Sequence, residues 1–61
     1  MKRGDQVNIY EDPLTEKKFE GTAQIIRKEF DLSNGLAMYT VEFLGYEGIH
    51  LQRRIKEERN D

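Results

Sequence analysis

Apolar and polar residues alternate with a period of two along most of the chain. In residues 5–10 (DQVNIY), polar side chains separate Val7 from Ile9, and residues 36–44 (LAMYTVEFL) repeat this alternation over a longer run. Because successive side chains of a β-strand point to opposite faces, both segments are predicted to be strands, with Tyr39 on the buried face of the second.

Two further segments favour strands, and the tail is less regular. Residues 21–30 (GTAQIIRKEF) are rich in β-branched and apolar side chains. Residues 48–54 (GIHLQRR) predict a short strand with Ile49 and Leu51 facing the core. The tail, residues 53–61 (RRIKEERND), favours a tight turn followed by a brief last strand or a short helix.

The Asn-Gly pair at residues 34–35 gives the strongest local signal. Both residue types tolerate the positive φ angles that a type I′ hairpin turn requires. A two-residue loop at this point pairs Phe30 with Tyr39 and Ile26 with Phe43. This register buries the aromatic and aliphatic side chains of both strands.

The same register leaves one conflict. It places Phe30 and Leu32 inside and pairs Arg27 with Glu42 on the surface, but it turns Ile25 outward. A β-bulge within residues 24–26 would let the first part of the strand face inward as well. A strand that bends in this way can take part in two sheets and so close a small barrel.

Residues 11–21 (EDPLTEKKFEG) are a polar stretch between two predicted strands. Pro13 fixes its own φ at the start, and Gly21 frees the backbone at the end, so we expect a long first loop. Leu14 and Phe19 are predicted to fold back and cap the open end of the barrel. Alternatively, this loop has a functional role and determines the specificity of recognition.

Short connections complete the predicted fold. Residues 45–48 (GYEG) favour a three- or five-residue loop, and Ile55 is expected to be the last core residue. Five short strands with a long first loop and tight later turns are the pattern of an SH3-like barrel. The predicted class is therefore all-β: a small five-stranded SH3-like barrel with a short C-terminal turn or helix.

Length and composition set the limits on this fold. A chain of 61 residues makes one domain, residues 1–61, and a domain of this size buries only about 60% of its unfolded surface. There is no cysteine to form a disulfide. No apolar run approaches the roughly 20 residues that span a bilayer, and the N-terminal residues do not resemble a signal peptide. We therefore expect a cytoplasmic protein without a membrane partner.

Few residues suit catalysis or metal binding. His50 is the only histidine and is expected to point to solvent or to a neighbouring strand, and adjacent acids such as Glu57 and Glu58 lie in polar segments. No phosphate-binding glycine loop or metal-ligand spacing occurs. The sequence predicts no catalytic residue, no metal site, no cofactor and no small-molecule substrate.

Residues 4–25 (GDQVNIYEDPLTEKKFEGTAQI) combine a Gly-Asp-x-Val-x-Ile-Tyr start, an Asp-Pro loop and a Glu-Gly-x-Ala strand entry. In these features the chain resembles small, largely uncharacterised SH3-like barrel proteins of bacteriophages, prophages and bacteria. The opening is also similar to KOW and Tudor-type modules, which bind ribosomal RNA, polymerase partners or methylated side chains. The first resemblance implies a fold and a phage or bacterial context but no activity.

The leading functional prediction is a non-catalytic module that binds another protein or a second copy of itself. An exposed apolar strip often marks such an interface. The predicted contact residues are the apolar side chains of the first loop, of one outward sheet face and of the last connection: Leu14, Phe19, Ile25, Met38, Leu44 and Tyr46.

The alternative prediction is a nucleic-acid-binding module. The net charge is −2, but basic residues gather near the C-terminus, where Arg53, Arg54, Lys56 and Arg59 could contact phosphates. Glutamates between these residues also allow a self-paired, solvated terminal turn.

Overall fold

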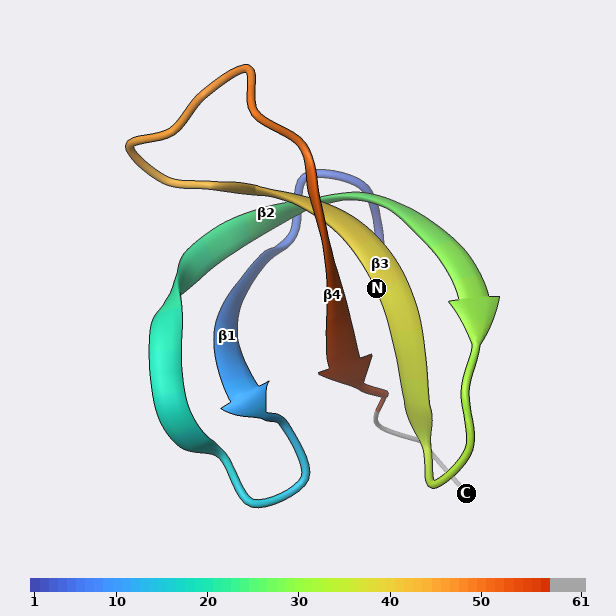
Figure 1. Cartoon of the computed structure of the whole chain (residues 1–61). Coiled ribbons are helices and arrows are strands. Elements are labelled where there is room, and N and C mark those ends of the chain that lie inside the picture. Colours follow the sequence, from blue (N-terminus) through green and yellow to red (C-terminus); the bar gives the residue numbers. More distant parts are fainter. Residues whose placement is uncertain (58–61) are drawn as a thin grey trace.

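The computed structural model of the protein describes residues 1–57 and contains four antiparallel strands in one sheet (Figure 1). The sheet order is β1-β2-β3-β4, the order of the strands in the chain. The strands are β1 (Gln6–Asp12), β2 (Lys17–Asp31), β3 (Leu36–Phe43) and β4 (Leu51–Lys56). The all-β prediction is confirmed.

The long strand β2 pairs with both of its neighbours along different parts of its length. Its first part runs antiparallel to β1 and its second part to β3, and the strand arches over the molecule in between (Figure 1). The pairing with β3 slips by one residue at Ile26 and by one more at Glu29. Each slip is a bulge that bends the strand and increases its twist. The bulge predicted within residues 24–26 is therefore confirmed.

The turn at residues 34–35 is confirmed, but the predicted register is wrong. Asn34 and Gly35 have φ angles of 61° and 75°. The Leu36 N–H donates to the Ser33 carbonyl at 3.3 Å, as a type I′ turn requires. The pairing is already displaced by one residue next to the turn, where the Leu32 N–H donates to the Leu36 carbonyl at 2.8 Å, so that Met38 rather than Tyr39 lies opposite Phe30. The bulges in β2 then add to this displacement.

This displacement changes which side chains of β2 face the core. Phe30 was expected inside but is 53% exposed, and Leu32 is only half-buried. The predicted surface pair of Arg27 with Glu42 is also wrong. Arg27 lies opposite Thr40 and forms an ion pair with Glu29 at 2.6 Å instead.

The core lies on the concave side of the curved sheet. Tyr39, Ile9, Ile25 and Val41 are its largest fully buried side chains. Ile25, predicted to be a surface contact residue, is therefore a core residue, because the bulge after it lets it face the same side as its neighbours. Ile55 is 7% exposed and is the last core residue among residues 1–57, as predicted.

The predicted long first loop is largely a two-stranded ribbon. β1 continues to Asp12 and β2 begins at Lys17, so the turn is confined to residues 13–16. The ribbon is irregular: the register slips between Ile9 and Tyr10. Polar side chains on both faces of this ribbon gave it the appearance of a loop in the sequence.

Gly21 lies where this ribbon meets the core. A Cβ atom at this position would lie 3.1 Å from Cδ1 of Phe43, closer than side chains normally approach. The glycine therefore lets β2 pass over the Phe43 ring, in addition to its predicted role at the strand entry.

The connection between β3 and β4 is longer than predicted and runs over residues 44–50. It contains two successive turns, closed by hydrogen bonds from the Tyr46 N–H to the Phe43 carbonyl (3.0 Å) and from the Ile49 N–H to the Tyr46 carbonyl (3.2 Å). The predicted inward positions of Ile49 and Leu51 are wrong, since these side chains are 51% and 38% exposed.

The C-terminal turn or helix is not found in the described part of the tail. Residues up to Lys56 belong to β4, where Ile55 lies opposite Ala37 and inserts into the core. Residues 58–61 lie outside the described residues. Within residues 1–57 the sheet has four strands and stays open, so a closed five-stranded barrel is not confirmed. No helix long and apolar enough to cross a membrane occurs there.

Replacing Ile25 with alanine tests the position of this residue. We expect I25A to lose about 2–5 kcal/mol of unfolding free energy, because it removes a fully buried side chain and leaves a cavity. Leu44→Ala, at a side chain that is 47% exposed, is the matched control and should change stability by about 0.5 kcal/mol or less. Urea unfolding followed by circular dichroism measures both. Equal effects would contradict the burial of Ile25.

Candidate functional site

A shallow apolar cleft opens beside the β3–β4 connection. It has a volume of about 260 Å³ and is lined by Phe43, Tyr46, Ile49 and Leu51 together with Glu20 of β2. Tyr46 and Ile49 are 65% and 51% exposed, whereas Phe43 is 9% exposed and forms the floor. Large apolar side chains that surround a hollow and remain exposed are typical of a binding surface.

Arg53 fixes one wall of the apolar cleft. Its guanidinium carbon lies 5.6 Å from the centre of the Phe43 ring, within the range of a cation–π contact. Its Nε and Nη2 atoms donate to the two carboxylate oxygens of Glu20 at 2.8 and 2.6 Å. The hydrogen bonds from Arg53 lower the pKa of Glu20, which holds this carboxylate charged. The floor and one wall of the cleft are therefore held in place by contacts within the chain.

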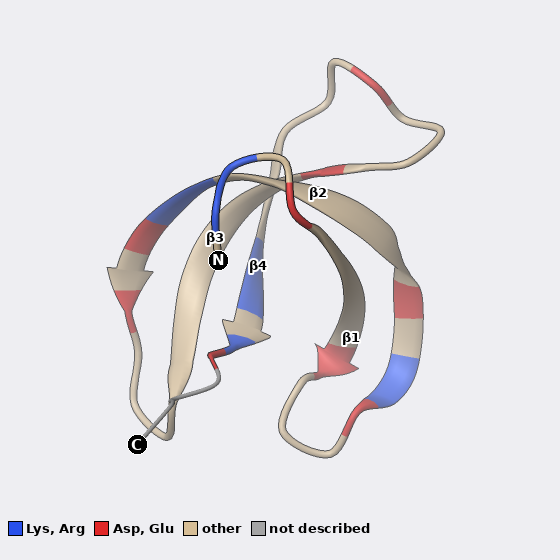
Figure 2. Ribbon diagram, turned by 180° about the vertical axis from the view of Figure 1, so that it is seen from behind, with Lys and Arg blue, Asp and Glu red and all other residues tan. Residues whose placement is uncertain are grey.

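Two further acidic residues lie on or against the β3–β4 connection, which carries Tyr46 and Ile49 of the cleft. Glu42 accepts a hydrogen bond from the Gly48 N–H at 3.1 Å and lies 3.3 Å from Nε2 of His50. Glu47 is exposed at the tip of the connection. Figure 2 shows acidic and no basic colouring on this connection. The contact of His50 with Glu42 agrees with the prediction that it points to solvent or across to a neighbouring strand.

A second groove lies where the two edges of the open sheet face each other. β1 and β4 are the edge strands, and they lie side by side in Figures 1 and 2. The groove between them, here called the seam, has a volume of about 400 Å³. Side chains of both edges line it, among them Val7, Tyr10, Arg54, Ile55 and Lys56.

A side chain bridges one end of the seam. Nη2 of Arg54 donates to the main-chain carbonyl of Glu11 at 3.1 Å. Arg54 also helps to lower the pKa of Asp12, after the larger effect of the hydrogen bond from Thr15. The two edges are therefore linked through a side chain, and they are not hydrogen-bonded neighbours in the sheet.

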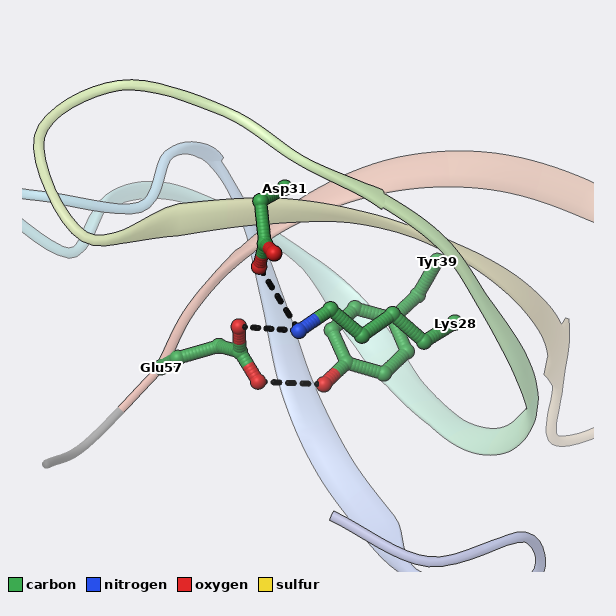
Figure 3. A network of polar contacts seen from close by, with 4 residues as sticks. All are labelled: Lys28, Asp31, Tyr39 and Glu57. Carbon is green, nitrogen blue, oxygen red and sulfur yellow. Dashed lines mark hydrogen bonds and ion pairs between the residues drawn. The ribbon is translucent and has the colours of Figure 1, made fainter.

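A polar network fastens the end of β4 to β2 and β3 (Figure 3). Lys28 Nζ lies 2.7 Å from Asp31 Oδ1 and 2.9 Å from Glu57 Oε1, and the Tyr39 hydroxyl donates to Glu57 Oε2 at 2.8 Å. Hydrogen bonds from Lys28 and Tyr39 lower the pKa of Glu57. Burial and the bond to Glu57 raise the pKa of Tyr39 to about 12.

The structure separates the predicted protein-contact residues. Only Tyr46 lines the apolar cleft, and Leu44 is exposed on the same connection. Leu14 is exposed in the β1–β2 turn. Phe19 is 59% exposed and packs its ring edge-on against Tyr10, with 5.6 Å between the ring centres, rather than capping a barrel. Met38 is half-buried in β3.

Sequence reasoning missed two apolar residues of the cleft. Ile49 and Leu51 were assigned to the core, because alternation marks a face without showing whether anything covers it. Phe43 is a core residue, as predicted, and also forms the floor of the cleft. The two glycines of the connection were the available signal. Gly45 and Gly48 both have positive φ angles, and they lengthen the connection until Ile49 lies outside the core.

The predicted basic patch is also divided. Arg53 is paired with Glu20 of the apolar cleft, whereas Arg54 and Lys56 line the seam. Arg59 lies outside the described residues. Among residues 1–57, no group of three or more histidine, cysteine, aspartate or glutamate side chains is placed to hold a metal ion.

No protein-family model matches this chain, and neither the curated proteins nor the solved structures contain a match to it.

The network of Figure 3 predicts a loss of stability in strong base. The folded-state pKa of Tyr39, about 12, lies above its ordinary value of 10.0, so folding favours the neutral phenol. This contribution is complete below pH 10 or so and is lost as the pH rises through the folded-state value. The absorbance difference at 295 nm between the wild type and Tyr39→Phe should titrate near pH 12. A midpoint near 10 in the folded protein would contradict the network.

Proposed function

We propose that this protein is a non-catalytic module that binds a segment of another protein through the apolar cleft. The observation that carries the proposal is the group of exposed side chains Tyr46, Ile49 and Leu51 around a hollow with Phe43 as its floor. Keeping such side chains in water is unfavourable, and covering them would contribute roughly 25 cal/mol for each Å² of apolar surface removed from water.

The charged residues near the apolar cleft indicate which kind of segment would bind there. Glu42 contacts the β3–β4 connection and Glu47 belongs to it, and no lysine or arginine occurs between Glu29 and Gln52. The one arginine at the wall, Arg53, is already paired with Glu20. We therefore propose a segment with one bulky apolar side chain for the hollow and a lysine or arginine next to it.

The floor and one wall of the apolar cleft are already ordered in the free protein, which favours binding at this site. Arg53 is held between a carboxylate and an aromatic ring, and Phe43 is fixed in the core beneath it. A partner segment would therefore lose little free energy to ordering the floor and wall of the cleft.

The fold itself supports a relation to SH3-like barrels. One strand, β2, bends to pair with a different neighbour along each part, and the sheet curls until its edges face each other. Small barrels of this kind commonly act as binding scaffolds, and the predicted phage or bacterial context is compatible with such a role.

Nucleic-acid binding remains the alternative. It has less support, because Arg53 is neutralised by Glu20 and only Arg54 and Lys56 line a common surface. If it were correct, a fluorescent single-stranded oligonucleotide would bind at low salt and lose affinity steeply as salt rises. We expect no binding in this titration. Salt-dependent binding that Arg54→Glu abolishes would favour the alternative.

Capture experiments with matched variants test the proposal. A tagged wild-type protein should retain a partner from a native lysate, and Tyr46→Ala together with Ile49→Asp should reduce the retained amount about tenfold or more, because a charge in the hollow would be desolvated. Leu14→Asp, on the distant β1–β2 turn, is the control and should retain the partner. Quantitative mass spectrometry measures all three.

The outcomes separate the possible occupants of the apolar cleft. A partner that both variants retain equally would contradict the cleft as its site. If light scattering instead shows a dimer that the cleft variant dissociates, the occupant is a second copy. A monomer that captures nothing in any form would overturn the proposed function.

A further inference from the structure

We propose that the seam between β1 and β4 accepts an extended peptide strand that carries an acidic side chain. This site is distinct from the apolar cleft, and it would complete the sheet as a fifth strand between the two edges. The proposal rests on the free backbone edges, on the shape of the groove and on its charge.

Both edges present backbone groups to the seam. In an antiparallel strand, alternate residues direct their N–H and C=O groups to opposite sides. The Glu57 N–H donates to Gly35 of the β3 side, so the N–H of Lys56 is directed away from β3 and towards the seam. Likewise the Asp5 carbonyl accepts from Ile25 of β2, so the backbone of Gln6 is directed outward. Such edges bind an added strand through its main chain.

The walls of the seam suit the alternating side chains of a strand. Val7, Tyr10 and Ile55 give its inner side an apolar lining, and the volume of about 400 Å³ lies within the range of ordinary peptide and ligand sites. Arg54 links the two edges through its hydrogen bond to the Glu11 carbonyl, and the network around Glu57 fixes the end of β4 to β2 and β3. An entering strand would therefore find both edges in place.

The charge of the seam selects the occupant. Within residues 1–57, Lys56 makes no ion pair, and the exposed Arg54 donates only to a main-chain carbonyl. Two glutamates also line the seam: Glu57 is neutralised by Lys28, and Glu16 lies on the β1–β2 turn. A strand with apolar residues facing inward and a glutamate or aspartate facing outward would pair its carboxylate with Lys56.

A capped peptide, Thr-Val-Glu-Val-Thr-Val-Glu-Thr, is the probe. Titrated into the ¹⁵N-labelled protein, it should shift the amide signals of Gln6, Asn8, Arg54 and Lys56 and slow their hydrogen exchange. The control is the same peptide with alternate main-chain nitrogens methylated, which keeps the side chains but loses half of the N–H donors. It should bind about tenfold more weakly. A peptide with lysine in place of glutamate should also bind more weakly.

Two substitutions at one position separate backbone from charge. Lys56→Gln removes the cation and keeps the N–H, and should weaken binding about twofold. Lys56→Pro removes both, and should weaken binding about fivefold further, because one edge donor is lost. Circular dichroism confirms that each variant is folded. Tyr46→Ser should bind the peptide like the wild type, which distinguishes the seam from the apolar cleft.

Several results would overturn the proposal. These are equal affinity of the N-methylated peptide, shifts confined to the apolar cleft, or no shift at millimolar peptide. Shifts of the seam amides by an eight-nucleotide single strand but not by the peptide would identify the groove as a nucleic-acid site instead.

Discussion

The strand β2 has to pair with two neighbours at once, and the shape of the whole molecule depends on how it does so. A straight strand of this length would give a flat sheet with no enclosed interior. Slips beside Ile26 and Glu29 bend it instead, so that β1 and β3 lie on different parts of one arch. The arch encloses Ile25 and Tyr39 and brings the first and last strands face to face. The core and the seam therefore have the same physical origin.

Sequence patterns predicted the parts of this fold that bury one face. The strands around Ile9 and Tyr39 were found because water and core impose alternation on them. Ile55 was predicted to be a core residue, but it was placed in a tight turn rather than in β4. The ribbon around residues 13–16 was mistaken for a loop, since it extends beyond the core and has polar side chains on both faces. The outward position of Ile25 in the predicted register indicated one bulge in β2, but the second slip, beside Glu29, has no distinctive residue type, so the full register was not predicted.

The candidate sites illustrate a related limit. Composition identified Arg53 as part of a basic patch, and the alternation assigned Leu51 to the core. Only the three-dimensional arrangement shows that the arginine is neutralised by Glu20 and stacked on Phe43, and that Leu51 borders a hollow. A charge contributes to long-range attraction only if no neighbour compensates it, and an apolar side chain contributes to the core only if something covers it. Neither the compensation of a charge nor the covering of an apolar side chain can be read directly from the sequence.

The opposed edges of the sheet have a consequence for stoichiometry. A flat sheet offers each added strand a new free edge, so that growth can continue into fibres. Here the two edges face the same narrow space, and an occupant hydrogen-bonded to both would leave no edge behind. Association at this position would saturate at one strand per molecule, which makes it a terminating event rather than a propagating one.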